Sequence, residues 1–175
     1  LFLVSDSRQA SPRSDVERNS GDGAVAFLIG TEDVIAECDG FYAFSQNILD
    51  NWRSSNDPFV NTWEDRFSTE EGLDRVLQYS VDGFLDKYQL KPSDIDKIAL
   101  YAPDYRRHSS LAKRLGFEPS QIEDPMFDVL GNTGAAFALM ILAKTLEACS
   151  AGQRIVVAAY GDGSDILGFK VTGTA

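Results

Sequence analysis

Two turns in the last third of the chain could aim hydrogen-bond donors at a ligand. Asn132 follows a glycine and opens an apolar run over 132–148, and Gly163 lies in a glycine-rich turn after the apolar run 154–160. A helix start presents backbone N–H groups, an asparagine adds a side-chain amide, and glycine lets the backbone approach a ligand closely. Both turns are therefore candidate donor sites.

One helix and two strands must position these turns. The run 132–148 is rich in Ala, Leu and Met and carries charge only near its end. A helix that is apolar all round is buried on both sides, which predicts a layered body. Asn132 or Thr133 is the expected N-cap. The runs 154–160 and 166–171 are expected to be buried strands.

The upstream chain also alternates strands and helices, which predicts an α/β layered domain over residues 1–175. The expected elements are strands at 24–29, 34–38 and 98–102, and helices at 68–90 and 105–115. The first two strands are expected to pair through the turn between them, and a capping box at Ser68 is expected to begin the first helix. The aromatic-rich segment 39–67 is either a functional loop or a cover packed on the core.

Composition limits the class of partner. The chain has 175 residues, 43% of them hydrophobic, and a net charge of -11. Such an acidic chain argues against nucleic acid or an anionic membrane as partner. Cys38 and Cys149 stand far apart without metal-ligand spacing, which indicates a reducing compartment, no metal and a cytoplasmic protein. The apolar start 1–4 is too short for a secretory signal and is interpreted as the end of a strand that begins upstream.

Several short motifs, taken in order, resemble one known family. They are Gly-Asp-Gly-Ala at 21–24, Asp-Asn-Trp-Arg at 50–53 with Phe-Ser at 67–68, Lys-Arg-Leu-Gly at 113–116, Gly-Asn-Thr at 131–133 and Tyr-Gly-Asp-Gly at 160–163. The set resembles the C-terminal half of thiolase-superfamily condensing enzymes and is similar to hydroxymethylglutaryl-CoA synthase and 3-ketoacyl-carrier-protein synthase III. The resemblance implies the C-terminal half only of a stacked αβαβα fold, with the nucleophilic cysteine in the N-terminal half.

The resemblance also implies donor roles for three residues. In the family, a histidine and an asparagine from this half donate to the thioester oxygen of the second substrate, and these places hold Tyr101 and Asn132. Free tyrosine ionises only near pH ~10, so it can donate a hydrogen bond but is a poor base at neutrality. The Gly163 turn would direct a backbone amide toward the acylated cysteine. The alternatives are that Asn132 only caps a helix and that the glycine turn only joins two strands.

Other residues are candidates for holding coenzyme A. Trp52 and Arg53 could sandwich and pair with an adenine nucleotide, or they could simply cover the core. Arg106 belongs to a basic cluster with Arg107, Lys113 and Arg114 that could bind phosphate, or it could lie on a solvated helix face. The only histidine, His108, lies on the same helix and is expected to face solvent. Cys38 and Cys149 are expected to be structural thiols.

The resulting hypothesis is an acyl-CoA condensing enzyme that performs Claisen-type acyl transfer when this chain is combined with the N-terminal half. No tightly bound cofactor is expected, and a coenzyme A thioester is the expected substrate, delivered as acyl-CoA or on an acyl carrier protein. A dimer or another homo- or hetero-oligomer is the expected assembly. The alternative is a non-catalytic thiolase-like subunit that completes a partner's site. A flavodoxin-like binding domain fits less well, because no loop has a phosphate-binding glycine fingerprint.

Overall fold

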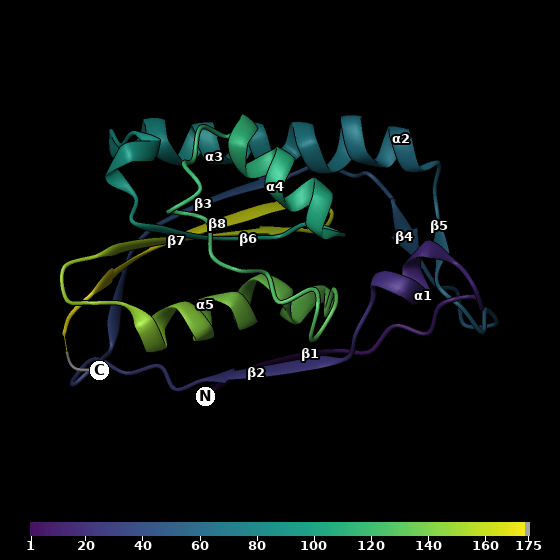
Figure 1. Ribbon diagram of the computed structural model, residues 1–175, viewed down its shortest axis with the longest axis horizontal. Helices are drawn as coiled ribbons and strands as arrows, with labels where there is room; N and C mark the ends of the chain where they lie inside the picture. The colour runs from purple at the N-terminus through teal and green to yellow at the C-terminus, as the bar shows by residue number, and fades with distance from the viewer. Residues whose placement is uncertain (174–175) are drawn as a thin grey trace.

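The computed structural model describes residues 1–173. Figure 1 shows stacked layers: α3 and α4 cover one face of a central sheet, α5 covers the other face, and the β1–β2 ribbon lies beyond α5. The elements are β1 (Phe2–Asp6), α1 (Asp15–Asn19), β2 (Gly23–Phe27), β3 (Ala36–Ser45), β4 (Asn51–Trp52), β5 (Asn61–Thr62), α2 (Asp65–Phe67), a π-helical segment (Ser68–Asp74), α3 (Arg75–Tyr88), a 3-10 turn (Pro92–Asp94), β6 (Lys97–Leu100), α4 (Tyr105–Arg114), a second 3-10 turn (Gly134–Ala136), α5 (Phe137–Ala148), β7 (Arg154–Tyr160) and β8 (Gly163–Val171). This alternation of helices and sheets has the predicted layered α/β character. None of the helices in the described part of the chain is both long and apolar enough to cross a bilayer.

The central sheet brings together the ends of three strands. Within residues 1–173 its order is β3-β8-β7-β6, with β6 parallel to β7 and the other pairs antiparallel. Because β6 and β7 run in the same direction, Tyr101 emerges beside the end of β7, where its N–H donates to the Ala158 carbonyl at 2.8 Å. Tyr160 in turn lies opposite Ser164 at the start of β8. Tyr101, Tyr160 and the β7–β8 turn therefore lie at the same end of the sheet, where β6 and β7 finish and β8 begins.

Helix α5 confirms the predicted apolar helix. It contacts β6 and β7 on one side and β2 on the other. Phe137 and Ile141 are 2% and 0% exposed, and burying each side chain contributes roughly 1.5–3 kcal/mol. The predicted N-cap is wrong, because the α-helix begins only after a 3-10 turn, with Ala136 at its N-cap position and no side-chain cap. Asn132 instead accepts a hydrogen bond from the backbone N–H of Gly134.

The predicted pairing of 24–29 with 34–38 is wrong. β2 pairs with β1, whereas β3 pairs with β8 in the central sheet, so the intervening residues cross between layers and form no hairpin. β3 is also longer than predicted and runs into the aromatic-rich segment. Its register shifts between Cys38 and Gly40, so Cys38 lies at a bulge inside the strand and is exposed.

The helix predicted at 68–90 is present, but its capping box is not. The helical run starts earlier, at Asp65, where the Glu64 carboxylate accepts from the N–H groups of Arg66 and Phe67. Ser68 therefore lies inside the run, at the start of the π-helical segment. The Glu64 side chain thus caps this end of the helical run in place of the predicted serine.

His108 is buried, which corrects the expectation that it faces solvent. Only 1% of it is exposed, it packs edge-on against Phe127 with ring centroids 6.3 Å apart, and its Nε2 has no hydrogen-bond partner among the described residues. Burial lowers the pKa of His108 to about 4, although the Leu100 backbone and the Asp124 carboxylate partly oppose this change. The side chain is therefore neutral at pH 7.

A buried neutral histidine makes stability depend on pH. The folded pKa of His108 lies below the unfolded value of 6.5, so the unfolded chain binds more protons between these limits. The free energy of unfolding should fall as pH drops from 6.5 to 4, with His108 contributing a loss on the order of 3 kcal/mol. Urea unfolding of the wild type and of His108→Gln across this range measures that contribution. Parallel pH profiles for the two proteins would contradict it.

Candidate functional site

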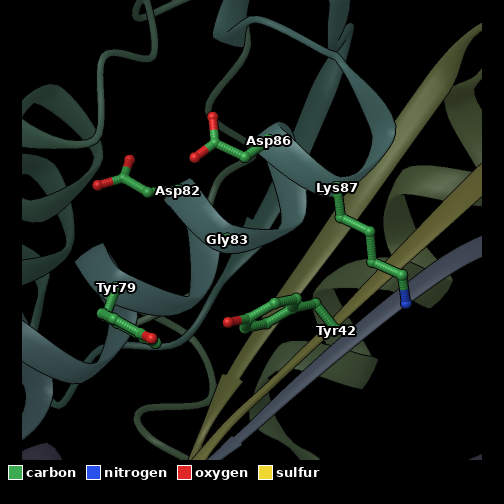
Figure 2. A pocket seen from close by; sticks show the side chains of 6 residues that line it. All are labelled: Tyr42, Tyr79, Asp82, Gly83, Asp86 and Lys87. Atoms are coloured by element: carbon green, nitrogen blue, oxygen red, sulfur yellow. The ribbon is translucent and has the colours of Figure 1, made fainter.

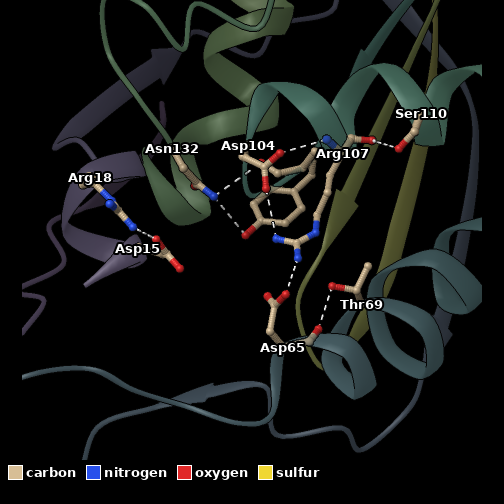
Figure 3. Close-up of polar contacts among 10 residues, drawn as sticks. Asp15, Arg18, Asp65, Thr69, Asp104, Arg107, Ser110 and Asn132 are labelled. Carbon is tan, nitrogen blue, oxygen red and sulfur yellow. Dashed lines mark hydrogen bonds and ion pairs between the residues drawn. The ribbon is translucent and has the colours of Figure 1, made fainter. Parts of the chain in front are cut away.

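Asn132 and Tyr101 meet at the mouth of α5. The Asn132 side-chain amide donates to the Tyr101 hydroxyl at 3.2 Å and to the Ala102 carbonyl at 3.4 Å. The two residues are 4% and 8% exposed, so this contact is almost fully buried. The two family-implied donors are thus adjacent in space. Figure 3 shows Asn132 pointing toward the start of α4, where Asp104 and Arg107 lie.

Backbone contacts fix the orientation of Asn132. Its Oδ1 accepts from the Gly134 N–H at 2.8 Å, and a backbone N–H can only donate, so the amide nitrogen must face Tyr101. Its own N–H donates to the Asn19 carbonyl at 2.6 Å, and its carbonyl accepts from Gly21 at 3.0 Å. The glycine motif at 21–23 therefore packs directly against the turn that carries Asn132. The approach is so close that a Cβ on Gly21 would lie 1.7 Å from the Leu130 carbonyl oxygen.

Aromatic rings enclose the other side of Tyr101. Its ring meets Phe137 edge-on at 5.7 Å and stacks with Tyr160 at 5.9 Å, where distances join ring centroids. The Tyr160 hydroxyl is buried without a hydrogen-bond partner among the described residues. Burial, more than the nearby Asp50 carboxylate, raises the pKa of Tyr160, so this hydroxyl stays protonated. The site therefore offers neutral donors in apolar surroundings, where hydrogen bonds to a charged oxygen are strong.

Arg8 is a member of this cluster that sequence reasoning missed. It follows β1, and its Nε lies 3.1 Å from Asp6 Oδ2, which also accepts from the Ala135 N–H at 3.0 Å. A Cβ on Gly134 would lie 1.9 Å from Asp6 Oδ2 and 2.7 Å from Arg8 Nε, so both side chains pack closely against the turn after Asn132. Burial alone would lower the pKa of Arg8, but charge interactions and hydrogen bonds with Tyr101 and Asp6 raise it.

Gly163 lies in the β7–β8 turn, one residue before the partner of Tyr160. Its φ is +127°, and a Cβ there would lie 2.0 Å from the Phe44 carbonyl oxygen. No hydrogen bond within residues 1–173 joins it to Asn132 or Tyr101; its link to them runs through the stacked ring of Tyr160. A role for Gly163 in the site stays a prediction.

The three candidate coenzyme A residues lie elsewhere on the surface. Trp52 forms the short β4–β5 ribbon and packs against Trp63, with ring centroids 6.0 Å apart, while its neighbour Arg53 is exposed. Arg106 is exposed on α4 and lines a hollow of about 300 Å³ together with Asp104, Arg107 and Ser110. No contact among the described residues joins Trp52 or Arg53 to Arg106, so the structure does not gather them into one site.

The predicted basic cluster on α4 is largely neutralised. Arg107 pairs with Asp104 at 3.0 Å and with Asp65 at 2.5 Å, as Figure 3 shows, and Arg114 pairs with Asp74 at 2.6 Å. Arg106 and Lys113 are exposed, so any attraction for phosphate on this face rests mainly on those two side chains.

A larger hollow of about 540 Å³ lies between β3 and α3, away from the Asn132–Tyr101 pair. Figure 2 shows Tyr42 and Tyr79 pointing toward one another there, with Asp82, Asp86 and Lys87 along the helix. The Lys87 ammonium donates to the Phe41 carbonyl, and the Phe41 N–H donates to the Tyr88 hydroxyl. These two side chains therefore cover part of the β3 edge. The acidic rim gives no basis for an anionic ligand. Residues 1–173 also contain no group of three or more His, Cys, Asp or Glu side chains suited to a metal ion.

This fold and these motifs match known proteins of one class. Residues 85–171 match the family described as 3-oxoacyl-[acyl-carrier-protein] synthase III C terminal. In sequence and fold, the chain resembles the C-terminal half of thiolase-superfamily condensing enzymes, which confirms the predicted resemblance and the predicted fold class.

The individual relatives sharpen this likeness. A hydroxymethylglutaryl-CoA synthase of Methanopyrus kandleri is 30% identical over 175 residues, which are 98% of this chain and 50% of the relative. A crystal structure of HMG-CoA synthase complexed with CoA has a TM-score of 0.80 at 18% identity and covers 98% of this chain and 48% of its own. The 3-oxoacyl-[acyl-carrier-protein] synthase III of Aquifex aeolicus has a TM-score of 0.73 at 17% identity, over 86% of this chain and 50% of its own. The chain spans about half the length of these relatives.

The β7–β8 turn offers a matched pair of glycines for a stability test. Gly163 needs a positive φ and has no room for a Cβ, whereas Gly161 in the same turn has nothing within 4 Å of that position. Gly163→Ala should lower the free energy of unfolding by about 1–3 kcal/mol, and Gly161→Ala should change it by less than about 0.5 kcal/mol. Chemical denaturation of both variants measures the difference, and equal effects would show that the turn has no such constraint.

Proposed function

We propose that the complete protein is an acyl-CoA condensing enzyme of the hydroxymethylglutaryl-CoA synthase or ketoacyl synthase III type. In this proposal, Asn132 and Tyr101 donate to the thioester oxygen of the second substrate, a coenzyme A thioester or its carrier-bound equivalent. The observation that carries it is the buried 3.2 Å contact between these two side chains at the mouth of α5, in a fold similar to HMG-CoA synthase complexed with CoA. A dry, preorganised donor pair of this kind stabilises developing negative charge on oxygen.

The remaining parts of the machinery follow from the family. The nucleophilic cysteine would come from the other half of the fold, since Cys38 is exposed at a bulge and Cys149 ends α5. Burial raises the pKa of Cys149, which keeps it a thiol and fits a packing role. Gly163 would direct a backbone amide toward the acylated cysteine. Trp52 and Arg53 are the proposed contacts for the adenine nucleotide of coenzyme A, and Arg106 is proposed separately as a phosphate contact on α4.

One observation favours a second candidate function, a non-catalytic subunit that completes a partner's site. Both hydrogens of the Asn132 amide are already used, by Tyr101 and by the Ala102 carbonyl. A substrate oxygen must therefore displace one of these contacts or take its hydrogen bond from Tyr101. In addition, tyrosine at the histidine place is a poor base at neutral pH, which weakens proton abstraction from the second substrate.

Replacing Asn132 separates the two functions. If the complete protein condenses acyl-CoA substrates, Asn132→Ala should lower kcat by about ten- to a thousand-fold, because an oxyanion donor is lost. The release of free coenzyme A, followed with a thiol reagent, measures the rate. Asn19→Ala is the matched control, since its exposed side chain lies on the neighbouring segment that contacts Asn132 only through its backbone. Unchanged turnover in Asn132→Ala would remove this residue from the site.

The proposed partner is the N-terminal half of the fold or a homologous subunit. Helix α5 itself is covered within this chain, because β2 packs on its second face. Exposed apolar side chains lie at one end of the β1–β2 ribbon, where Leu3 is 67% and Leu28 is 86% exposed. A monomer rarely leaves such neighbouring apolar side chains in water, so this ribbon is the surface that we expect a partner to cover.

The chain 1–175 on its own should therefore bind a hydrophobic dye or self-associate. The double substitution of Leu3→Ser and Leu28→Ser should reduce dye fluorescence, and Tyr105→Ser should leave it unchanged, because Tyr105 is 62% exposed on the opposite side of the body, on α4. Adding the complementary half should also quench the signal. A monodisperse wild-type monomer that binds no dye would refute the expected interface.

A further inference from the structure

Strand β3 forms one edge of the central sheet, and within residues 1–173 no other strand pairs with its outer side. The N–H and carbonyl of Phe41 point outward, away from β8, because two side chains of α3 bond them. Gln46 points inward, since its N–H donates to the Asp162 carbonyl in the β7–β8 turn. The direction of these groups alternates along a strand, so Ala43 and Ser45 also direct their N–H and carbonyl groups outward. Part of the β3 edge is therefore free to pair.

The hollow of about 540 Å³ between β3 and α3 lies beside this free edge, and aromatic rings line it. Tyr42 packs so closely on α3 that a Cβ on Gly83 would lie 2.4 Å from its Cζ atom. Glycine inside a helix costs about 1 kcal/mol relative to alanine, so Gly83 marks the place where α3 makes room for this ring. Tyr79 is 55% exposed and packs against Phe44, with ring centroids 4.5 Å apart. The hollow therefore offers aromatic surface next to backbone groups that can pair.

The rim of the hollow carries negative charge that has no counter-charge within residues 1–173. Figure 2 shows the Tyr42 ring on one side of Gly83 and the carboxylates of Asp82 and Asp86 on the other. The Asp82 carboxylate accepts only from the Gln78 amide, and neither carboxylate forms an ion pair with the described residues. The lysine that lines the hollow bonds the β3 backbone instead. Aromatic faces and unpaired carboxylates together attract a cation, above all a guanidinium.

We propose that the β3 edge at Ala43 and Ser45 is a docking site for an extended segment of a partner protein, in which apolar and basic residues alternate. The segment adds a strand to the sheet by exchanging backbone hydrogen bonds with these two residues. Side chains opposite one another in a sheet share a face, so the residues opposite Tyr42 and Phe44 point toward the hollow. Arginine at these places meets the rings and the two carboxylates. The residue opposite Ala43 points to the other face, beside the exposed Phe41 ring, and is apolar.

A second copy of this chain fits the edge poorly. Two β3 edges paired antiparallel about Ala43 would bring two acidic rims to the same side of one sheet. Each chain already carries a net charge of -11, so this pairing sets like charges against each other. A basic segment brings the opposite charge. Its contact is short, because Lys87 and Tyr88 cover the edge at Phe41.

Three synthetic peptides test the inference on the complete protein by calorimetry. The probe is acetyl-Thr-Val-Arg-Val-Arg-Val-Thr-amide, whose arginines share one face when it is extended. Its isomer with the order Thr-Arg-Arg-Val-Val-Val-Thr has the same charge but places the arginines on opposite faces, so it should bind about tenfold more weakly. The probe with an N-methyl group on its central valine has no donor for the Ala43 carbonyl and should bind at least about tenfold more weakly.

Substitutions in the protein test the same contacts. Asp82→Asn combined with Asp86→Asn should weaken the probe about tenfold, because two ion pairs are lost. Glu70→Gln combined with Glu71→Gln is the matched control, since it removes the same charge from exposed residues of the neighbouring π-helical segment and should change the affinity by less than about twofold. Ala43→Pro should abolish binding, because it removes an outward N–H that makes no bond to β8.

The results that would overturn the inference are distinct. Equal affinity for the probe and its isomer would mean that an acidic protein attracts any basic peptide. An unchanged affinity in the variant with both aspartates replaced would remove the hollow from the site. Self-association of the complete protein in sedimentation, lost in Ala43→Pro, would assign the edge to a second copy and also overturn the inference. None of these measurements needs turnover, so they do not depend on the proposed function.

Discussion

The hydrogen bond from Asn132 to Tyr101 is the contact on which the geometry of the site depends. It joins the mouth of the buried helix α5 to the end of strand β6, two segments that are 31 residues apart in sequence. Each partner is fixed separately: Tyr101 by the Ala158 carbonyl, and Asn132 by Gly134 and by the backbone of Asn19. A buried polar contact of this kind tolerates little movement, since an unpaired amide in apolar surroundings costs about 1–3 kcal/mol.

The chemistry available at this contact follows from neutral donors beside one cation. Tyr101 and Tyr160 are stacked, Phe137 packs edge-on against Tyr101, and Arg8, paired with Asp6, lies beside the turn after Asn132. Such a site can stabilise negative charge that develops on a carbonyl oxygen, whereas a phenol is a poor base for proton abstraction at neutral pH.

The sequence predicted the elements whose patterns are strong and local. The apolar run of α5, the strands β7 and β8, and the order of motifs that brings Asn132 near Tyr101 are all present. His108 was misplaced although a signal existed: it lies three and four residues before the buried Leu111 and Ala112, on the same helix face. Strand β3 was predicted too short and with the wrong partner, because a bulge interrupts it after Cys38 and its partner β8 lies far along the chain. Arg8 could not be found, since only the folded contact between β1 and the 3-10 turn Gly134–Ala136 brings it beside the turn after Asn132.

The most direct test of this account is a structure of the complete protein with a stable acyl-CoA analogue that retains the carbonyl oxygen. This oxygen should lie within ~3 Å of both the Tyr101 hydroxyl and the Asn132 amide nitrogen. A carbonyl bound elsewhere, with Asn132 and Tyr101 sealed from the ligand, would contradict it and leave their contact a purely structural one.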